Sequence, residues 1–196
     1  MKIITHGCSF TKNHLPCWPK FVEWFTDHEV VNRGYADSSN ETISRDAINS
    51  AIEFKSGISH MYIMWSANDK FEYYKTLEHI LRTQHFLSNY SLRYTMMICK
   101  QSVLSDIEHN LYNEIDWDKF IFYNQNKGLH EYSLDNFKEY YNPGDLHPPP
   151  IAHYYWTKNI IFQSEMFAPK DKLDTLEYSF NNTDNNRDKK DGRYRL

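Results

Sequence analysis

Short apolar runs and segments with helical periodicity alternate along most of this chain. Met61–Trp65 is a continuous apolar run bounded by polar residues, and Tyr94–Cys99 is largely apolar. Runs of this kind are typical of strands that are buried on both faces of a parallel sheet. The pattern predicts five strands, which are Lys2–Thr5, Glu29–Asn32, Met61–Trp65, Tyr94–Cys99 and Lys119–Tyr123.

Between these runs, apolar residues recur at the spacing of a helix. Ser38–Glu41 is typical of a capping box that starts a helix, and the apolar residues behind it fall on one helical face, namely Ile43, Ala47, Ile48, Ala51 and Ile52. Helices are predicted over about 18–25, 43–52, 71–85 and 103–115, with a last helix beginning near Pro148. Strands that alternate with helices imply right-handed crossovers and a three-layer α/β/α sandwich.

The end of the 196-residue chain differs in composition from the rest. From residue 170 onward Asp, Asn, Lys and Arg predominate and apolar residues are few. Such a segment cannot offset its ordering entropy by burial. The sequence therefore predicts one α/β domain over 1–169, followed over 170–196 by either a flexible tail or a docking arm for a protein partner.

Charge and cysteine content exclude several classes of protein. The chain has 22 basic and 26 acidic residues, a net charge of −4, which argues against a nucleic-acid binder. Cys8, Cys17 and Cys99 form no CxxC pair, and together with His6 and His14 they match no recognised metal-ligand spacing. No signal peptide or membrane segment is recognised, so the expected location is the cytoplasm, with no membrane partner.

Polar residues suited to acyl transfer follow the ends of the predicted strands. Ser9 follows the first strand, a stretch from Asn32 to Asn40 follows the second, and Asn68 follows the third, while Asp145–Pro148 precedes the last helix. In an open parallel sheet all of these positions project into the crevice at the carboxyl ends of the strands. A hydroxyl, an Asp/His pair and amide donors are the groups that nucleophilic acyl transfer requires.

These blocks resemble those of the SGNH hydrolases, also called GDSL esterases and lipases, in kind and in order. The chain carries Gly7-Cys8-Ser9-Phe10-Thr11 where the family has Gly-Asp-Ser, a variant that looks like a subset of viral and marine-bacterial members. The other three blocks are Asn32 with Gly34 and Asp37, Ser66-Ala67-Asn68-Asp69, and Asp145-Leu146-His147-Pro148. The resemblance covers roughly residues 1 to 165 and implies a flavodoxin-like, five-stranded parallel sheet.

By this resemblance Ser9 would be the nucleophile, His147 the general base and Asp145 the acid that orients it. The oxyanion donors would be the backbone amides of Ser9 and Asp37 and the side chain of Asn68. No cofactor or metal is implied. The expected reaction is the hydrolysis of a small ester, such as an acetyl or short acyl group on a carbohydrate, through an acyl-enzyme.

One departure from the family pattern keeps other functions open. Asp37 stands where the family has a glycine, and its carboxylate would oppose a developing oxyanion unless it points away. A second hypothesis is therefore a structural or glycan-binding component of a viral particle or larger assembly, with little or no turnover. A third is a transferase on the same scaffold. His153 is interpreted as a helix residue that packs near the site rather than as a base.

Overall fold

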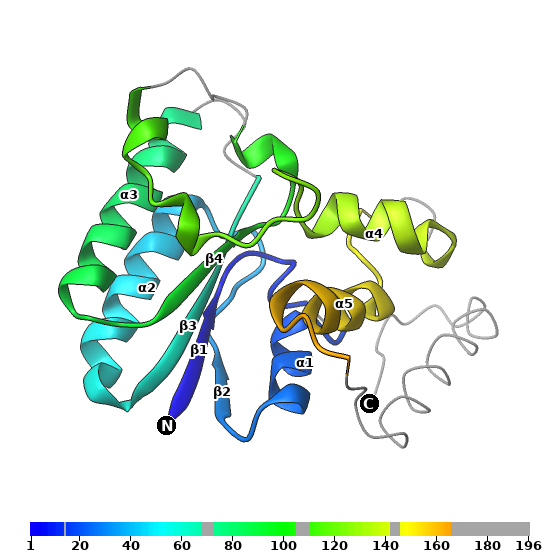
Figure 1. Cartoon of the computed structure of the whole chain (residues 1–196), viewed down its shortest axis with the longest axis horizontal. Helices are drawn as coiled ribbons and strands as arrows, with labels where there is room; N and C mark the ends of the chain where they lie inside the picture. Colours follow the sequence, from blue (N-terminus) through cyan, green and yellow to red (C-terminus); the bar gives the residue numbers. More distant parts are fainter. Residues whose placement is uncertain (14, 68–72, 105–109, 142–145, 166–196) are drawn as a thin grey trace.

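The computed structural model describes residues 1–13, 15–67, 73–104, 110–141 and 146–165 (Figure 1). Its centre is a parallel sheet with the strand order β2-β1-β3-β4. Ile4 of β1 pairs with Val31 on one side and with Met61 on the other, and Ile4, Ile63 and Met64 are fully buried. The strands are β1 (Lys2–His6), β2 (Glu29–Asn32), β3 (Ile58–Trp65) and β4 (Tyr94–Ile98).

Helices cover both faces of this sheet, which confirms the predicted α/β/α sandwich. Helices α2 and α3 pack together on one face, and α1 and α5 lie on the other, with α4 beside α5 (Figure 1). The helices are α1 (Trp18–Phe25), α2 (Asn40–Phe54), α3 (Tyr73–Asn89), α4 (Leu129–Phe137) and α5 (Pro150–Trp156), which continues as a π-helical turn over Thr157–Ile161.

Helix α2 shows how local sequence and burial agree. Ser39 is its N-cap, and the Ser39 side chain accepts a hydrogen bond from the Thr42 amide at 3.2 Å, an interaction that stabilises a helix by about 1 kcal/mol. Ile43, Ala47 and Ala51 are buried against the sheet side of the helix. The helix ends where Lys55 takes a positive φ of 38°. The predicted start of this helix is therefore confirmed, and its apolar face in part, because Ile48 is only half-buried and Ile52 is exposed.

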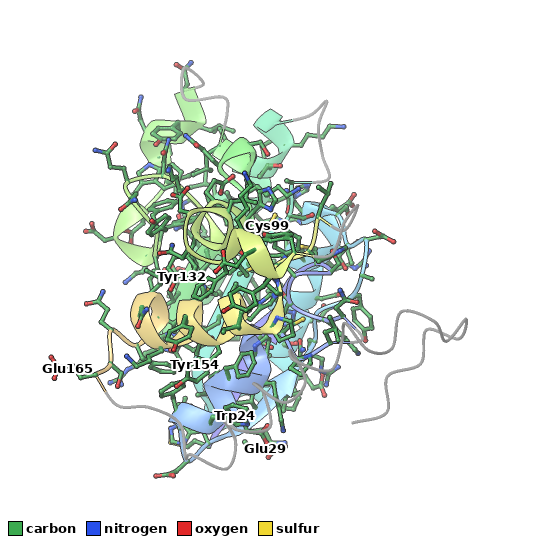
Figure 2. The ribbon with its side chains drawn as sticks, turned by 90° about the vertical axis from the view of Figure 1, so that its right-hand side faces the viewer. Trp24, Glu29, Cys99, Tyr132, Tyr154 and Glu165 are labelled. Carbon is green, nitrogen blue, oxygen red and sulfur yellow. The ribbon has the colours of Figure 1, made fainter. Side chains whose placement is uncertain are left out.

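Aromatic side chains fill the layer formed by α1 and α5. Phe21 and Tyr154 are almost completely buried, and their ring centroids lie 5.7 Å apart in an edge-to-face arrangement. Trp24 also packs against Tyr154, with centroids 6.3 Å apart; Figure 2 labels both residues on this side of the molecule. This packing fixes the position of α5, and with it the chain that enters α5.

The predicted fifth strand at Lys119–Tyr123 is wrong, because the described sheet has four strands. A 3₁₀ turn over Trp117–Lys119 precedes this segment, and left-handed residues at Asn124 and Gln125 follow it. The backbone between them makes only one isolated parallel bridge to the sheet, from Met96 to Phe120. The segment between the two turns is too short to form the repeated hydrogen bonds of a fifth strand with β4. Its apolar side chains form an aromatic cluster instead.

The segment after β4 also differs from its prediction. A helix over 103–115 is expected, whereas the described parts of this segment form 3₁₀ turns at Gln101–Leu104 and Asn110–Glu114. Helix α4 is not predicted. It begins at Gly128, whose amide donates to the Glu131 carboxylate at 2.9 Å, and a Cβ at Gly128 would lie 2.4 Å from the carbonyl oxygen of Ile98. Close approach to the end of β4 therefore requires glycine there.

Within the described ranges, no helix combines the length and the apolar character needed to cross a membrane. The predicted tail, 170–196, lies outside the described residues, and its docking role stays a prediction.

Candidate active site

The nucleophile candidate, Ser9, lies in a tight turn at the carboxyl end of β1. The amides of Thr11 and Lys12 both donate to the carbonyl of Cys8, at 2.8 and 3.1 Å. Cys8 is 2 % exposed, whereas Ser9 is half-buried. The turn thus buries the residue before the serine and leaves Ser9 itself partly exposed at the edge of the sheet.

His147 reaches Ser9 from the other end of the sequence. The His147 Nε2 and Ser9 Oγ atoms are 2.9 Å apart, joined by a hydrogen bond across 138 positions of the chain. The Phe10 ring packs against the His147 imidazole, with centroids 5.5 Å apart. In the neutral imidazole with its proton on Nδ1, Nε2 accepts a hydrogen bond from the hydroxyl, which is the arrangement that activates a serine.

The loop after β2 is tied to the turn of Ser9 by Asn32. The Asn32 Nδ2 group donates to the Thr11 carbonyl at 2.9 Å, and its Oδ1 atom accepts from the Gly34 amide at 2.9 Å. The Tyr35 amide donates to the Gly7 carbonyl at 3.0 Å. These contacts hold the second block against the first, as convergence at the carboxyl edge of the sheet predicts.

Asp37 follows in the same loop and has a left-handed backbone, with φ of 59°. This region favours glycine, the residue that the family pattern has at this position. The Asp37 residue is exposed. The backbone conformation that a glycine would provide is therefore present without the glycine.

Two predicted site residues, Asn68 and Asp145, lie outside the described residues. The end of β3, just before Asn68, is held by Asn40, which is fully buried. The Asn40 side chain accepts from the Ser66 amide at 2.8 Å and donates to the Ser66 carbonyl at 3.0 Å. Asn40 ends the predicted polar stretch after the second strand and lies in the predicted helix start, but the sequence pattern does not indicate this contact, because its partner lies 26 positions away.

Burial and a hydrogen bond shift the pKa values of the titratable groups beneath the site. Burial lowers the pKa of His6 to about 3, and neither of its ring nitrogens has a hydrogen-bond partner among the described residues, so this ring is neutral. A hydrogen bond with Cys99 lowers the pKa of Cys8, while burial raises the pKa of Cys99. No group of three His, Cys, Asp or Glu in the described part of the chain could hold a metal ion.

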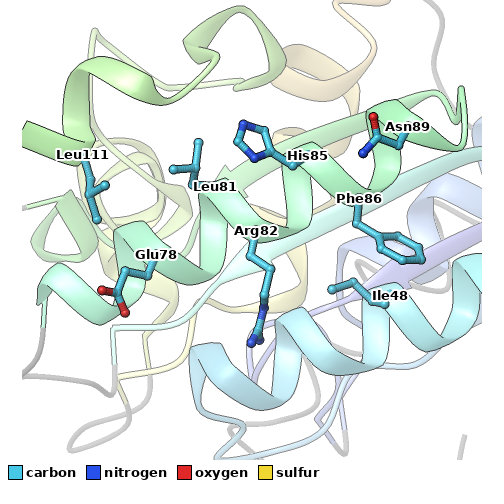
Figure 3. Close-up of a pocket in the computed structure, with 8 residues that line it drawn as sticks. All are labelled: Ile48, Glu78, Leu81, Arg82, His85, Phe86, Asn89 and Leu111. Carbon is cyan, nitrogen blue, oxygen red and sulfur yellow. The ribbon is translucent and has the colours of Figure 1, made fainter.

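The larger cavity is not at this site. It has a volume of about 590 Å³ and lies between α2 and α3, beside Ile48, Arg82 and Phe86 (Figure 3). None of its lining residues belongs to the loops of Ser9, Asp37 or His147. A smaller cavity of about 180 Å³ adjoins the turn of Ser9 and is lined by Thr11, Lys12 and Asn32 among others. Neither Ser9 nor His147 lines either of these two cavities, so the hydrogen bond between their side chains, and not a cavity, identifies the candidate site.

No protein-family model matches the sequence, and no curated protein matches it. Solved structures do match. A lipolytic protein of the G-D-S-L family from Desulfitobacterium hafniense DCB-2 is similar with a TM-score of 0.59 and 14% identity, over 80% of this chain and 95% of that one. TesA is similar with a TM-score of 0.58 and 9% identity, over 81% of this chain and 95% of that one. The psychrotrophic esterase EstA from Pseudoalteromonas sp., inhibited by monoethylphosphonate, is similar with a TM-score of 0.57 and 13% identity, over 92% of this chain and 99% of that one.

The chain therefore has the fold of the GDSL, or SGNH, lipolytic proteins, which confirms the predicted fold class and the resemblance at the level of the fold. The likeness to a viral and marine-bacterial subset stays a prediction.

Proposed function

We propose that this chain is a serine ester hydrolase that acts through an acyl-enzyme on a small ester. The observation that carries the proposal is the 2.9 Å hydrogen bond between Ser9 Oγ and His147 Nε2 at the carboxyl edge of the sheet. Similarity of fold to lipolytic proteins and esterases supports the same reaction class. Catalytic inactivity would be favoured by a Ser9 hydroxyl out of reach of His147, and the short distance argues against it.

In the proposed reaction, His147 takes the proton of the Ser9 hydroxyl as Oγ attacks the ester carbonyl. The carbonyl π pair moves to oxygen, and the tetrahedral intermediate carries an oxyanion. Collapse of this intermediate breaks the bond to the alcohol, which leaves with the proton from His147. Water then attacks the acyl-enzyme with the same base, releasing the acid and restoring Ser9.

The oxyanion donors in this proposal are the backbone amides of Ser9 and Asp37 and the side chain of Asn68, with Asp145 orienting His147. A left-handed φ at Asp37 supports the choice of its amide. Loss of one such donor typically lowers kcat by about 10² to 10³. An acetyl or short acyl group on a carbohydrate is the proposed substrate, with no cofactor.

The test uses a fluorophosphonate probe, an analogue of the inhibitor class bound to the Pseudoalteromonas esterase, together with turnover of p-nitrophenyl acetate. We expect the probe to label Ser9, as located by mass spectrometry, and Ser9→Ala to lower turnover by at least about 10³-fold. Ser59→Ala is the matched control, because the Ser59 hydroxyl bonds the Lys2 carbonyl at the opposite end of the sheet. Labelling elsewhere, or turnover that survives Ser9→Ala, would refute the proposal.

A further inference from the structure

A lysine shares the turn of the proposed nucleophile. The amides of Thr11 and Lys12 both donate to the Cys8 carbonyl, at 2.8 and 3.1 Å, so this segment forms one turn with the hydrogen bonding of a helix. Side chains three positions apart in such a turn lie on the same face, with Cβ atoms about 5–6 Å apart. Lys12 is three positions after Ser9, and its side chain therefore starts beside that of Ser9.

The Lys12 side chain extends toward the loop after β2. Its Nζ atom lies 4.9 Å from the centroid of the Tyr35 ring, and the Tyr35 amide donates to the Gly7 carbonyl at 3.0 Å. Lys12 and Tyr35 are thus both tied to the backbone that precedes Ser9. The ring attracts the ammonium group electrostatically but offers no oxygen acceptor to its three N–H donors.

A cavity of about 180 Å³ lies next to Lys12. Its walls come from the turn of Ser9, from Leu15 and Cys17 in the segment that enters α1, and from Asn32 at the end of β2. This volume is far above the roughly 15 Å³ that one water molecule needs. A small charged group such as a carboxylate therefore fits in the cavity.

Positive charge predominates around this cavity. Among the described residues that line it, Lys12 and Lys20 are charged and none is acidic. The Lys20 Nζ atom is paired with Glu23 Oε2 at 2.6 Å, whereas no described carboxylate, that of Asp37 included, forms an ion pair with Lys12. One positive charge is left without a partner in the described part of the chain, and it matches a monoanion.

Lys2 shows that contact with a ring does not prevent a lysine from pairing with a carboxylate. The Lys2 Nζ atom lies 5.3 Å from the centroid of Phe54 and 3.1 Å from Glu29 Oε1. Lys12 has the same kind of ring contact, but no described residue supplies the carboxylate. The Lys12 ammonium, held beside a cavity, is therefore suited to a carboxylate from outside the chain.

We propose that Lys12 and the cavity beside it form a subsite for a carboxylate carried by the ester substrate, either in the acyl chain or in the alcohol. The proposal rests on the proposed function and adds a negative charge to its substrate class. An acidic sugar would supply such a carboxylate on the alcohol side. Lys12 binds the substrate in this scheme and takes no part in the bond-breaking steps.

The test measures selectivity within two pairs of esters that differ by one negative charge. On the alcohol side, para-acetoxybenzoate is compared with para-acetoxybenzamide. On the acyl side, the p-nitrophenyl monoester of adipic acid is compared with p-nitrophenyl hexanoate. We expect Lys12→Met to lower the ratio of kcat/KM values, charged over neutral, by about 5- to 20-fold in one pair, and Lys12→Glu to lower it further. The pair that responds identifies the part of the substrate that carries the carboxylate.

Two other lysines that lie over aromatic rings provide the controls. Lys119 lies 5.7 Å from the centroid of Tyr94 at the start of β4, at the opposite edge of the sheet, and Lys119→Met should change neither ratio by more than about twofold, because distant exposed charges are screened. Lys100 lies 5.8 Å from the centroid of Phe10 near the site but does not line the cavity.

A loss of selectivity in Lys100→Met equal to that in Lys12→Met would indicate a general positive field, and it would overturn the subsite. Ratios that stay unchanged for both pairs in Lys12→Met would overturn it as well.

Binding measured without turnover separates failure of this proposal from failure of the proposed function. Benzoate, with benzamide as the neutral comparison, is added at constant ionic strength to isotope-labelled protein. The backbone amide signal of Thr11 should shift with benzoate only, and the shift should be lost in Lys12→Met. A wild-type protein that the fluorophosphonate probe does not label would refute the hydrolase proposal, and a benzoate shift would still support the subsite. Absence of that shift in wild type would overturn the subsite whatever the activity.

Discussion

Gly7 lies between the end of β1 and the turn of Ser9, and the structure leaves no room for a side chain there. Its φ is +156°, which side chains rarely tolerate, and a Cβ would lie 2.0 Å from Thr11 Oγ1 and 3.0 Å from the backbone oxygen of Met64. Thr11 is fully buried, so its side chain has little room to move away. We therefore expect Gly7→Ala to destabilise the protein.

The magnitude follows from two contributions. An unfavourable backbone conformation costs about 1–3 kcal/mol, and overpacking in a core costs about 1–3 kcal/mol. We expect Gly7→Ala to lower the free energy of unfolding by about 2–5 kcal/mol, which at this chain length corresponds to a fall in Tm of roughly 5–15 °C. Gly57→Ala is the matched control, since a Cβ at Gly57 has no atom within 4 Å, and its effect should stay within about 0.5 kcal/mol.

Urea unfolding of four proteins tests this reasoning: wild type, Gly7→Ala, Thr11→Ala and the double variant. Thr11→Ala removes the oxygen that the new Cβ would meet, so Gly7→Ala should cost about 1–2 kcal/mol less in that background. A Gly7→Ala variant as stable as Gly57→Ala would show that the turn has room to adjust. Equal penalties in both backgrounds would show that Thr11 is not the obstacle.

The two remaining predictions concern Asp37 and His6. Asp37→Gly removes a carboxylate beside the proposed oxyanion site, so kcat for p-nitrophenyl acetate should rise several-fold. Glycine also suits the φ of 59° at this position, so the free energy of unfolding should change by no more than about 1 kcal/mol. A lower kcat would refute the role of this position. The pKa of His6 is about 3 in the folded chain and 6.5 when unperturbed, so below pH 6.5 the unfolded chain binds a proton that the folded chain does not. The free energy of unfolding therefore decreases as the pH is lowered from about 6.5 to 3, by up to about 1.4 kcal/mol per pH unit. His6→Leu should flatten this slope in urea titrations at several pH values, and an unchanged slope would contradict the buried neutral ring.

The sheet and the meeting of Ser9 with His147 could be predicted because each depends on a strong, simple rule. A continuous apolar run such as Met61–Trp65 is typical of a strand covered on both faces. Parallel strands bring their carboxyl ends to one edge, so polar residues that follow successive strands converge there. The separation of 138 positions between Ser9 and His147 is therefore no obstacle to prediction.

The elements that were missed depend on partners distant in sequence. Helix α4 begins where Glu131 accepts from the amides of Gly128 and Gln101, and Gly128 packs against the end of β4.

Asp37 shows how a departure in sequence can coexist with conservation of backbone geometry. A left-handed conformation costs a residue other than glycine about 1–2 kcal/mol, and such a conformation persists only when its surroundings impose it. Here those surroundings are the hydrogen bonds of Asn32 to Gly34 and of Tyr35 to Gly7, which hold the loop against the turn of Ser9. Residue 37 is exposed, and its φ of 59° lies in the region that a glycine would adopt. The Asp37 amide is thus compatible with an oxyanion donor, and the carboxylate that accompanies it is expected to tune the rate rather than to abolish the reaction.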